Sequence, residues 1–180
     1  MHVLQWIAVH AYEKDEALQI VQHNLSEMLG KEESRTNTWY DWFVAGGGRW
    51  NVGEGEDNSE AYVEGKTNLV LSAKEEPDLF DERVLQSMES RKAEFDGYAK
   101  DVDSSIIDKI ITHYNPREFD FPAFQALYPV KKLIDMAYGT WDMNSYFYDM
   151  ENDTTTTKYM FESIDKDPEN WYLVPVDFHF

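Results

Sequence analysis

Residues 3–12 read VLQWIAVHAY and residues 15–30 read DEALQIVQHNLSEMLG, and these two segments decide the fold. In the first, both alternating sets of side chains are largely apolar, which predicts a central strand that is covered on both faces. In the second, apolar residues recur every three or four positions, which predicts a helix with one buried face. We expect Asp15 to cap the N-terminus of this helix and Gly30 to end it.

The same patterns predict further elements along the chain. Alternating runs predict strands, and apolar spacings of three to four residues predict helices. We expect a long helix from Pro77 and a later helix with Pro129 at its first position, where the missing proline amide costs nothing. The other expected elements are strands within residues 40–45, 67–73, 141–150 and 171–180, and helices within residues 104–114 and 154–164.

Strands and helices are mixed along the chain rather than strictly alternating, which favours an α+β fold. We expect a mostly antiparallel sheet with helices packed against it. The strand–helix opening and the strand at the far end are compatible with a ferredoxin-like core that carries a helical insertion at about residues 78–139. With 180 residues and no linker-like composition, residues 1–180 are expected to form a single acidic domain.

Composition limits the class of protein. Hydrophobic residues make up 42% of the chain and aromatic residues 15%, which is enough for a folded core. There is no cysteine, so disulfides, thiolate metal sites and cysteine nucleophiles are excluded. The first residues show neither the basic region nor the apolar run of a signal peptide, and we expect a cytoplasmic protein.

Charge is the most unusual property of the sequence, because 35 acidic residues face 16 basic ones, for a formal net charge of −19. Phosphate contacts require lysine and arginine, so direct binding to nucleic acid or to an anionic membrane is disfavoured and a basic protein partner is favoured. The alternative is that the acid excess only keeps the protein soluble and monomeric. The acids concentrate in two stretches, and the candidates for contact with a partner are Glu54, Glu56, Asp57, Glu60, Glu64, Asp142, Asp149, Glu151 and Asp153.

Residues 46–49 read GGGR and lie between two tryptophans. Consecutive glycines can turn backbone amides toward an anion, the arginine could clamp it, and a tryptophan could stack on a base. The segment lacks the Lys-Ser/Thr pair of a P-loop and the spacing of a dinucleotide fingerprint. The alternative is a tight bend in which Arg49 pairs with a nearby acid such as Asp41. The ligand-binding candidates in this segment are Trp42, Gly47, Gly48, Arg49 and Trp50.

Asp177 and His179 form a second candidate site, because alternate side chains of the last strand project from the same face. A carboxylate and an imidazole at this spacing could serve metal binding or acid–base chemistry. Such a site needs three converging groups, and His10 could be the third if the first and last strands are neighbours. The alternative is a histidine that is hydrogen-bonded to an aspartate at the end of the sheet. We therefore assign no metal, no cofactor and no catalytic residue.

Two stretches, WYDWFVAGGGRW at residues 39–50 and VPVDFH at residues 174–179, resemble uncharacterised proteins of phages and bacteria. Those proteins carry a similar aromatic strand that runs into Gly-Gly-Arg-Trp, and they end in a strand with Asp-x-His. The resemblance covers the two ends, about a third of the chain. It implies a phage or mobile-element setting and, since the family has no assigned activity, no particular chemistry.

Two hypotheses of different classes follow. The first is a phage-type interaction protein in the host cytoplasm that binds and inhibits a basic, nucleic-acid-binding host protein, such as a defence nuclease of CRISPR or restriction type. Its carboxylates would mimic the phosphates of nucleic acid. The second is a nucleotide-binding protein or hydrolase that uses the Gly-Gly-Gly-Arg-Trp segment together with Asp177 and His179. The absence of a catalytic motif favours the non-enzymatic hypothesis.

Overall fold

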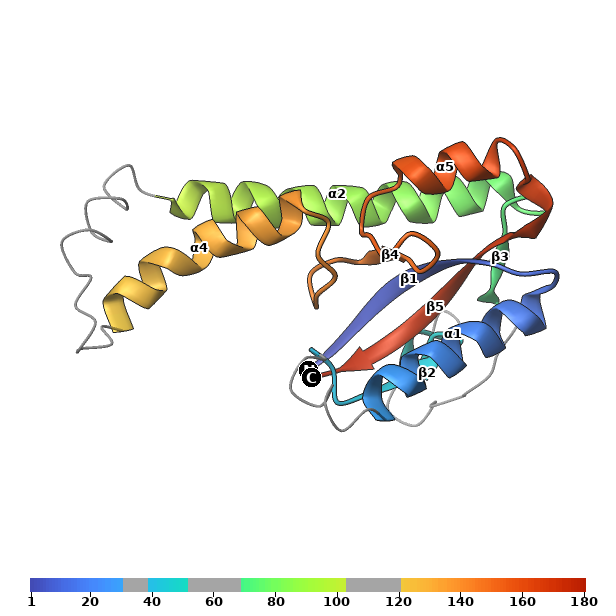
Figure 1. The fold of residues 1–180 in the computed structure, drawn as a ribbon, viewed down its shortest axis with the longest axis horizontal. Coiled ribbons are helices and arrows are strands. Elements are labelled where there is room, and N and C mark those ends of the chain that lie inside the picture. Colours follow the sequence, from blue (N-terminus) through green and yellow to red (C-terminus); the bar gives the residue numbers. More distant parts are fainter. Residues whose placement is uncertain (31–38, 52–68, 103–120) are drawn as a thin grey trace.

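Figure 1 shows the computed structural model, which describes residues 1–30, 39–51, 69–102 and 121–180. Among these residues, no helix combines the length and the apolar character that crossing a membrane requires. The elements in chain order are β1 (His2–His10), α1 (Lys14–Gly30), β2 (Trp42–Ala45), the 3-10 turn η1 (Gly48–Asn51), β3 (Leu71–Ser72), α2 (Pro77–Asp101), α4 (Phe121–Ala137), β4 (Phe147–Asp149), α5 (Lys158–Ile164), the 3-10 turn η3 (Pro168–Asn170) and β5 (Trp171–His179).

The sheet is built around the antiparallel pair of its first and last strands. β1 and β5 pair over nine residues, from His2 opposite His179 to His10 opposite Trp171. β2 and β3 pair antiparallel with opposite ends of β5, whereas β4 runs parallel to β1. The strand order is β2-β5-β1-β4, with β3 also beside β5. The predicted α+β class is confirmed and the sheet is mostly antiparallel, but the ferredoxin-like core is not confirmed.

Helices cover both faces of the sheet (Figure 1). α1 lies on one face and packs on odd-numbered side chains of β1 and even-numbered side chains of β5. α2 and α5 lie on the other face and pack on even-numbered side chains of β1 and odd-numbered side chains of β5. The two-sided cover explains why both alternating sets of β1 are apolar. Phe178 is fully buried on the α1 side, and Phe80 and Phe147 are buried on the α2 side.

α1 begins one residue before its predicted cap. Asp15 lies in the first turn with Glu16, and the amide of Ala17 donates to the carbonyl of Glu13. The prediction that Asp15 caps the helix was therefore wrong. Its carboxylate instead lies near the positive end of the helix dipole, which stabilises it there. The helix ends at Gly30, as the sequence predicts.

α2 and α4 pack against each other and extend away from the sheet (Figure 1). α2 begins at Pro77, as predicted. α4 begins at Phe121, so Pro129 lies inside the helix and the prediction that it occupies the first position was wrong. Gly139 follows the helix with a φ of 73°, a left-handed conformation in which glycine commonly ends helices. The helix expected within residues 104–114 lies outside the described residues.

The aromatic strand predicted at residues 141–150 is much shorter in the structure. Only Phe147–Asp149 form β4, and they pair with residues 6–8 of β1. Tyr146 has a left-handed backbone, with a φ of 57°, and a turn in which the amide of Ser145 donates to the carbonyl of Asp142 precedes it. β4 therefore covers the edge of β1 from Trp6 onward and leaves the first residues of that edge uncovered.

Removing the ring of Phe178 tests the core on the α1 side. The side chain is fully buried, so Phe178→Ala should lower the free energy of unfolding by ~3–5 kcal/mol through lost burial and the cavity left behind. Phe95 on α2 is 40% exposed, and Phe95→Ala should cost about 1 kcal/mol or less. Urea unfolding followed by circular dichroism measures both variants, and equal losses would contradict the placement of Phe178.

Candidate functional site

Asp177 of β5 is the centre of a polar cluster at one end of the sheet. Its side chain is fully buried, and the register places it between Leu4 of β1 and Val44 of β2. A buried carboxylate is costly unless hydrogen bonds and charges compensate it. His2 Nδ1 lies 2.9 Å from Oδ1, the backbone amide of Arg49 donates to Oδ2 at 3.3 Å, and Arg49 Nε lies 3.7 Å from Oδ2. We call these three residues the Asp177 cluster.

His2 links the carboxylate to the guanidinium of Arg49, whose Nη2 atom lies 2.8 Å from His2 Nε2. A guanidinium nitrogen can only donate, so Nε2 accepts and the ring proton is on Nδ1, which donates it to Asp177. These two contacts together require the tautomer that carries its proton on Nδ1. No sequence pattern pointed to His2, because the pairing of β1 with β5 brings it to a residue 175 positions away.

The glycine run forms a tight bend around this carboxylate. Gly46, Gly47 and Gly48 have φ values of 89°, 91° and 48°, a region that glycine adopts without strain. A Cβ added at Gly48 would lie 2.8 Å from Asp177 Oδ2 and 2.9 Å from its Cβ. The bend therefore turns toward a carboxylate of the chain itself. Arg49 also contacts Asp177 rather than Asp41, the acid that the sequence suggested.

His179 lies beside the Asp177 cluster but has a different partner. Its Nδ1 atom is 2.6 Å from Asp41 Oδ1, and its ring stacks on Trp42 with 4.9 Å between centroids. The hydrogen bond with His179 is the main cause that lowers the pKa of the Asp41 carboxyl. Asp177 and His179 thus share one face of β5, as predicted, but each is hydrogen-bonded to another residue rather than to the other.

The cluster does not have the composition of a metal site. Within the described ranges, no three His, Cys, Asp or Glu side chains converge closely enough to hold a metal ion. His10, the expected third group, lies at the opposite end of β1, where its Nε2 atom is 3.1 Å from Asp167 Oδ2. The strands are neighbours, but the antiparallel register sets His10 opposite Trp171, so that expectation was wrong.

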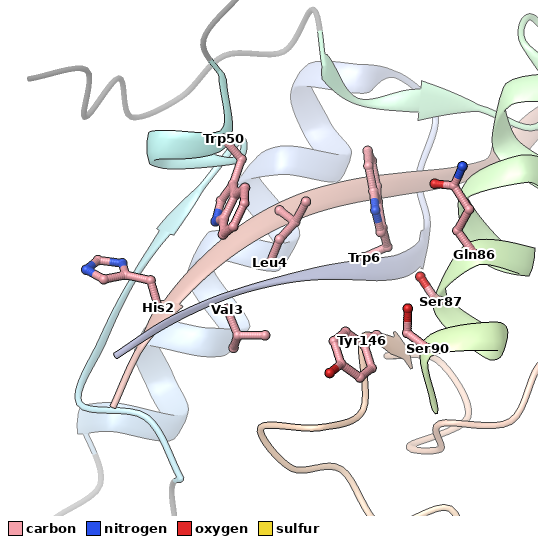
Figure 2. Close-up of a pocket in the computed structure, with 9 residues that line it drawn as sticks. All are labelled: His2, Val3, Leu4, Trp6, Trp50, Gln86, Ser87, Ser90 and Tyr146. Atoms are coloured by element: carbon pink, nitrogen blue, oxygen red, sulfur yellow. The ribbon is translucent and has the colours of Figure 1, made fainter. Parts of the chain in front are cut away.

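A groove lies beside the cluster, between β1 and α2 (Figure 2). It consists of two adjoining cavities of about 290 and 370 Å³. Leu4 and Trp6 of β1, Trp50 of η1 and Gln86 of α2 line both cavities. Figure 2 shows Trp50 and Trp6 on either side of Leu4. Trp50 is 52% exposed and borders the groove, whereas Trp42, the other candidate for stacking, is stacked on His179.

The nine acids predicted to contact a partner differ in their placement. Asp149 is fully buried and accepts hydrogen bonds from the amides of Glu151 and Asn152. It has no surface to offer a partner, so the prediction was wrong for this residue. Asp142 pairs with Lys132 at 2.6 Å inside the fold, whereas Glu151 and Asp153 are exposed. The other five lie outside the described residues: Glu54, Glu56, Asp57, Glu60 and Glu64.

Acids from several segments gather at the end of the sheet opposite the Asp177 cluster. α1, α2 and β5 begin there, and β1 and α5 end there (Figure 1). Contacts join the segments: Lys14 Nζ lies 2.7 Å from Glu76, and Lys74 Nζ lies 2.7 Å from Glu169. Lys166 is the third lysine of this end. Among the described residues, the ten carboxylates of what we call the acidic end belong to Glu13, Asp15, Glu16, Glu75, Glu76, Asp78, Glu151, Asp165, Asp167 and Glu169.

Two parts of the molecule can therefore carry a function. One is the groove beside the Asp177 cluster, and the other is the acidic end. Comparisons with protein-family models, with curated proteins and with solved structures found no match to this chain. No relative therefore indicates a role for either part, and the function is inferred from geometry and charge.

Gly48→Ala tests the close approach of the bend to Asp177. The positive φ and the contact with the carboxylate should lower the free energy of unfolding by about 1–3 kcal/mol. Gly97 in α2 has nothing within 4 Å of an added Cβ, so Gly97→Ala should raise the free energy of unfolding by up to ~1 kcal/mol. Urea unfolding of both variants is the measurement. A Gly48→Ala protein as stable as the wild type would show that the bend does not approach Asp177.

Asp149→Asn should change the pH dependence of stability in acid. Burial raises the pKa of Asp149 above its ordinary 3.8, while hydrogen bonds from Asn152 oppose the shift. The folded state thus holds this proton more tightly than the unfolded state, and the contribution of Asp149 to stability falls as pH rises through the window between the two pKa values. Unfolding free energies at a series of acidic pH values should therefore show the wild type losing stability relative to Asp149→Asn as pH rises. A wild type that gains stability relative to Asp149→Asn as pH rises would contradict the raised pKa of Asp149.

Proposed function

We propose that this protein binds a basic, nucleic-acid-binding protein through its acidic end and thereby excludes nucleic acid from that protein. The observation that supports the proposal is that the described residues gather ten carboxylates and three lysines at one end of the fold. The sequence indicated two acidic stretches. The fold adds acids from the starts of α1 and α2, which are not among the nine acids that the sequence analysis selected.

The architecture offsets the repulsion within this cluster of acids. α1 and α2 both begin at the acidic end, with Asp15, Glu16 and Asp78 in their first turns. The positive ends of two helix dipoles therefore lie among the carboxylates and stabilise them. Lys14 and Lys74 already pair with acids, which leaves little positive charge to repel a basic partner.

A surface of this kind competes with phosphates for the same lysine and arginine side chains. Because the Debye length is ~8 Å at physiological ionic strength, the attraction acts mainly near contact and weakens with added salt. The class of target that we propose is a host defence nuclease of CRISPR or restriction type, in keeping with the resemblance of the chain ends to phage proteins. A nucleotide site at residues 46–49 has less support, because the bend and Arg49 turn toward Asp177.

A capture experiment with matched charge variants tests the proposal. The immobilised protein is exposed to nuclease-treated bacterial lysate at low salt, and retained proteins are identified and then rebound in purified form. We expect basic, nucleic-acid-binding proteins that added DNA displaces. The triple variant Glu13→Gln, Asp78→Asn, Asp165→Asn removes three charges from the acidic end and should bind the captured protein roughly tenfold more weakly, at about 0.5 kcal/mol per charge.

The control variant removes the same number of charges elsewhere. Glu27→Gln, Glu89→Gln, Asp101→Asn replaces three exposed acids outside the acidic end, and it should change affinity by less than about twofold. If both variants bind the captured protein equally weakly, affinity depends on the net charge of the chain and not on the acidic end. Retained proteins that are not basic, or binding that ignores salt and DNA, would contradict the proposal outright.

A further inference from the structure

The backbone groups of β1 alternate between its two neighbours. In an antiparallel pair, successive residues point their amide and carbonyl groups alternately toward the partner strand and away from it. Met1 and Phe180 exchange backbone hydrogen bonds, so the odd-numbered residues of β1 point toward β5. The even-numbered residues point to the other side, where the amide of Trp6 donates to the carbonyl of Tyr146 at 2.9 Å.

The amide and carbonyl of Leu4 also point to that other side, but β4 does not extend far enough to pair with Leu4. β4 pairs with residues 6–8 of β1 only, because the left-handed backbone of Tyr146 turns the chain away. In the described part of the chain, no backbone hydrogen bond joins Leu4 to a strand on this side. The Leu4 amide and carbonyl therefore form an open donor and acceptor at a strand edge, which is a template for another strand.

The open edge faces the groove. His2, Val3 and Leu4 all line the cavity of about 290 Å³. Side chains alternate across a strand, so three consecutive residues border one cavity only where the strand edge itself forms a wall. Ser87 and Ser90 of α2 line the same cavity (Figure 2). An extended peptide between a strand edge and a helix can take main-chain hydrogen bonds from the strand and place alternate side chains in pockets.

The net charge of −19 favours a basic occupant, since Glu76, the acid that lines the groove, is already paired with Lys14. α2 carries seven acids and four bases over Pro77–Asp101. Of these bases, Arg83 lies 3.4 Å from Glu82 and also donates to Gln86, so its charge is already partly matched. Trp6 and Trp50 border both cavities, and the face of a tryptophan ring attracts a lysine or arginine side chain. A second copy of this chain is disfavoured, because its net charge of −19 repels an identical molecule.

We propose that the edge of β1 at Leu4 binds an extended basic segment of the partner as an added strand, with a lysine or arginine side chain placed between Trp6 and Trp50. This proposal rests on the proposed function for the identity of the partner as a basic protein. It concerns a different surface, because Leu4 and the acidic end at His10 are separated by roughly 20 Å along β1. One basic partner would thus contact both ends of the same strand.

A peptide titration tests the added strand directly. The probe is Ac-Thr-Lys-Val-Arg-Val-Lys-Thr-NH2, added to the full-length ¹⁵N-labelled protein and followed by NMR. Saturating peptide should slow hydrogen exchange of the Leu4 amide by at least about tenfold, because that amide gains an acceptor. A peptide with its three central amides N-methylated keeps the charge but loses strand pairing, and it should bind at least about tenfold more weakly.

Matched variants separate this site from the acidic end. Trp50→Ala should weaken peptide binding several-fold, whereas Tyr138→Ala, which removes an aromatic ring that is 85% exposed at a different place, should not. The triple variant of the acidic end should leave the slowing of Leu4 exchange intact. If the peptide changes only the chemical shifts of protein amides at the acidic end, the edge site is overturned and the proposed function still stands. No peptide binding, or a Leu4 amide already as protected as Val3 in the free protein through dimerisation, would also overturn it.

Discussion

The antiparallel pairing of β1 with β5 is the constraint on which the rest of this structure depends. Its register sets Leu4 opposite Asp177 and His10 opposite Trp171. The first consequence is that His2 reaches the buried carboxylate of Asp177, and the second is that His10 lies at the acidic end. A shift of the register by one residue would move every side chain of β1 to the other face of the sheet. Both proposed contact surfaces therefore depend on one strand pair.

The Asp177 cluster adds side-chain contacts to the backbone pairing at the chain ends. A buried carboxylate that loses a charged or hydrogen-bonded partner destabilises a protein by about 3–5 kcal/mol, so losing the contact of His2 or Arg49 with Asp177 should destabilise the fold. These groups contact one another, which makes the cluster a structural lock between β1, β5 and η1. The surfaces left for partners are then the open edge at Leu4 and the acidic end, where carboxylates are exposed.

Much of this fold could be predicted from local pattern, and the failures have physical causes. β1, α1 and the start of α2 follow from periodicity and from Pro77, because their packing needs only one or two buried faces. Pro129 was misplaced because α4 already begins at Phe121, eight residues before the proline. The strand predicted at residues 141–150 was too long, because the aromatic pattern does not reveal the left-handed turn at Tyr146. The candidate site could be predicted only in part, since His2 and the acids of the acidic end come together through long-range pairing.

Cross-strand proton contacts test the register of β1 and β5 most directly. In pairs that do not exchange hydrogen bonds, the two Cα atoms approach to about 4.5 Å, which brings their α-protons close together. NOE spectroscopy of the full-length protein should therefore show strong contacts between the α-protons of Leu4 and Asp177 and between those of His2 and His179. Contacts displaced by one residue, such as Leu4 with Val176 or Phe178, would contradict the account, because they would separate His2 from Asp177 and Leu4 from the groove.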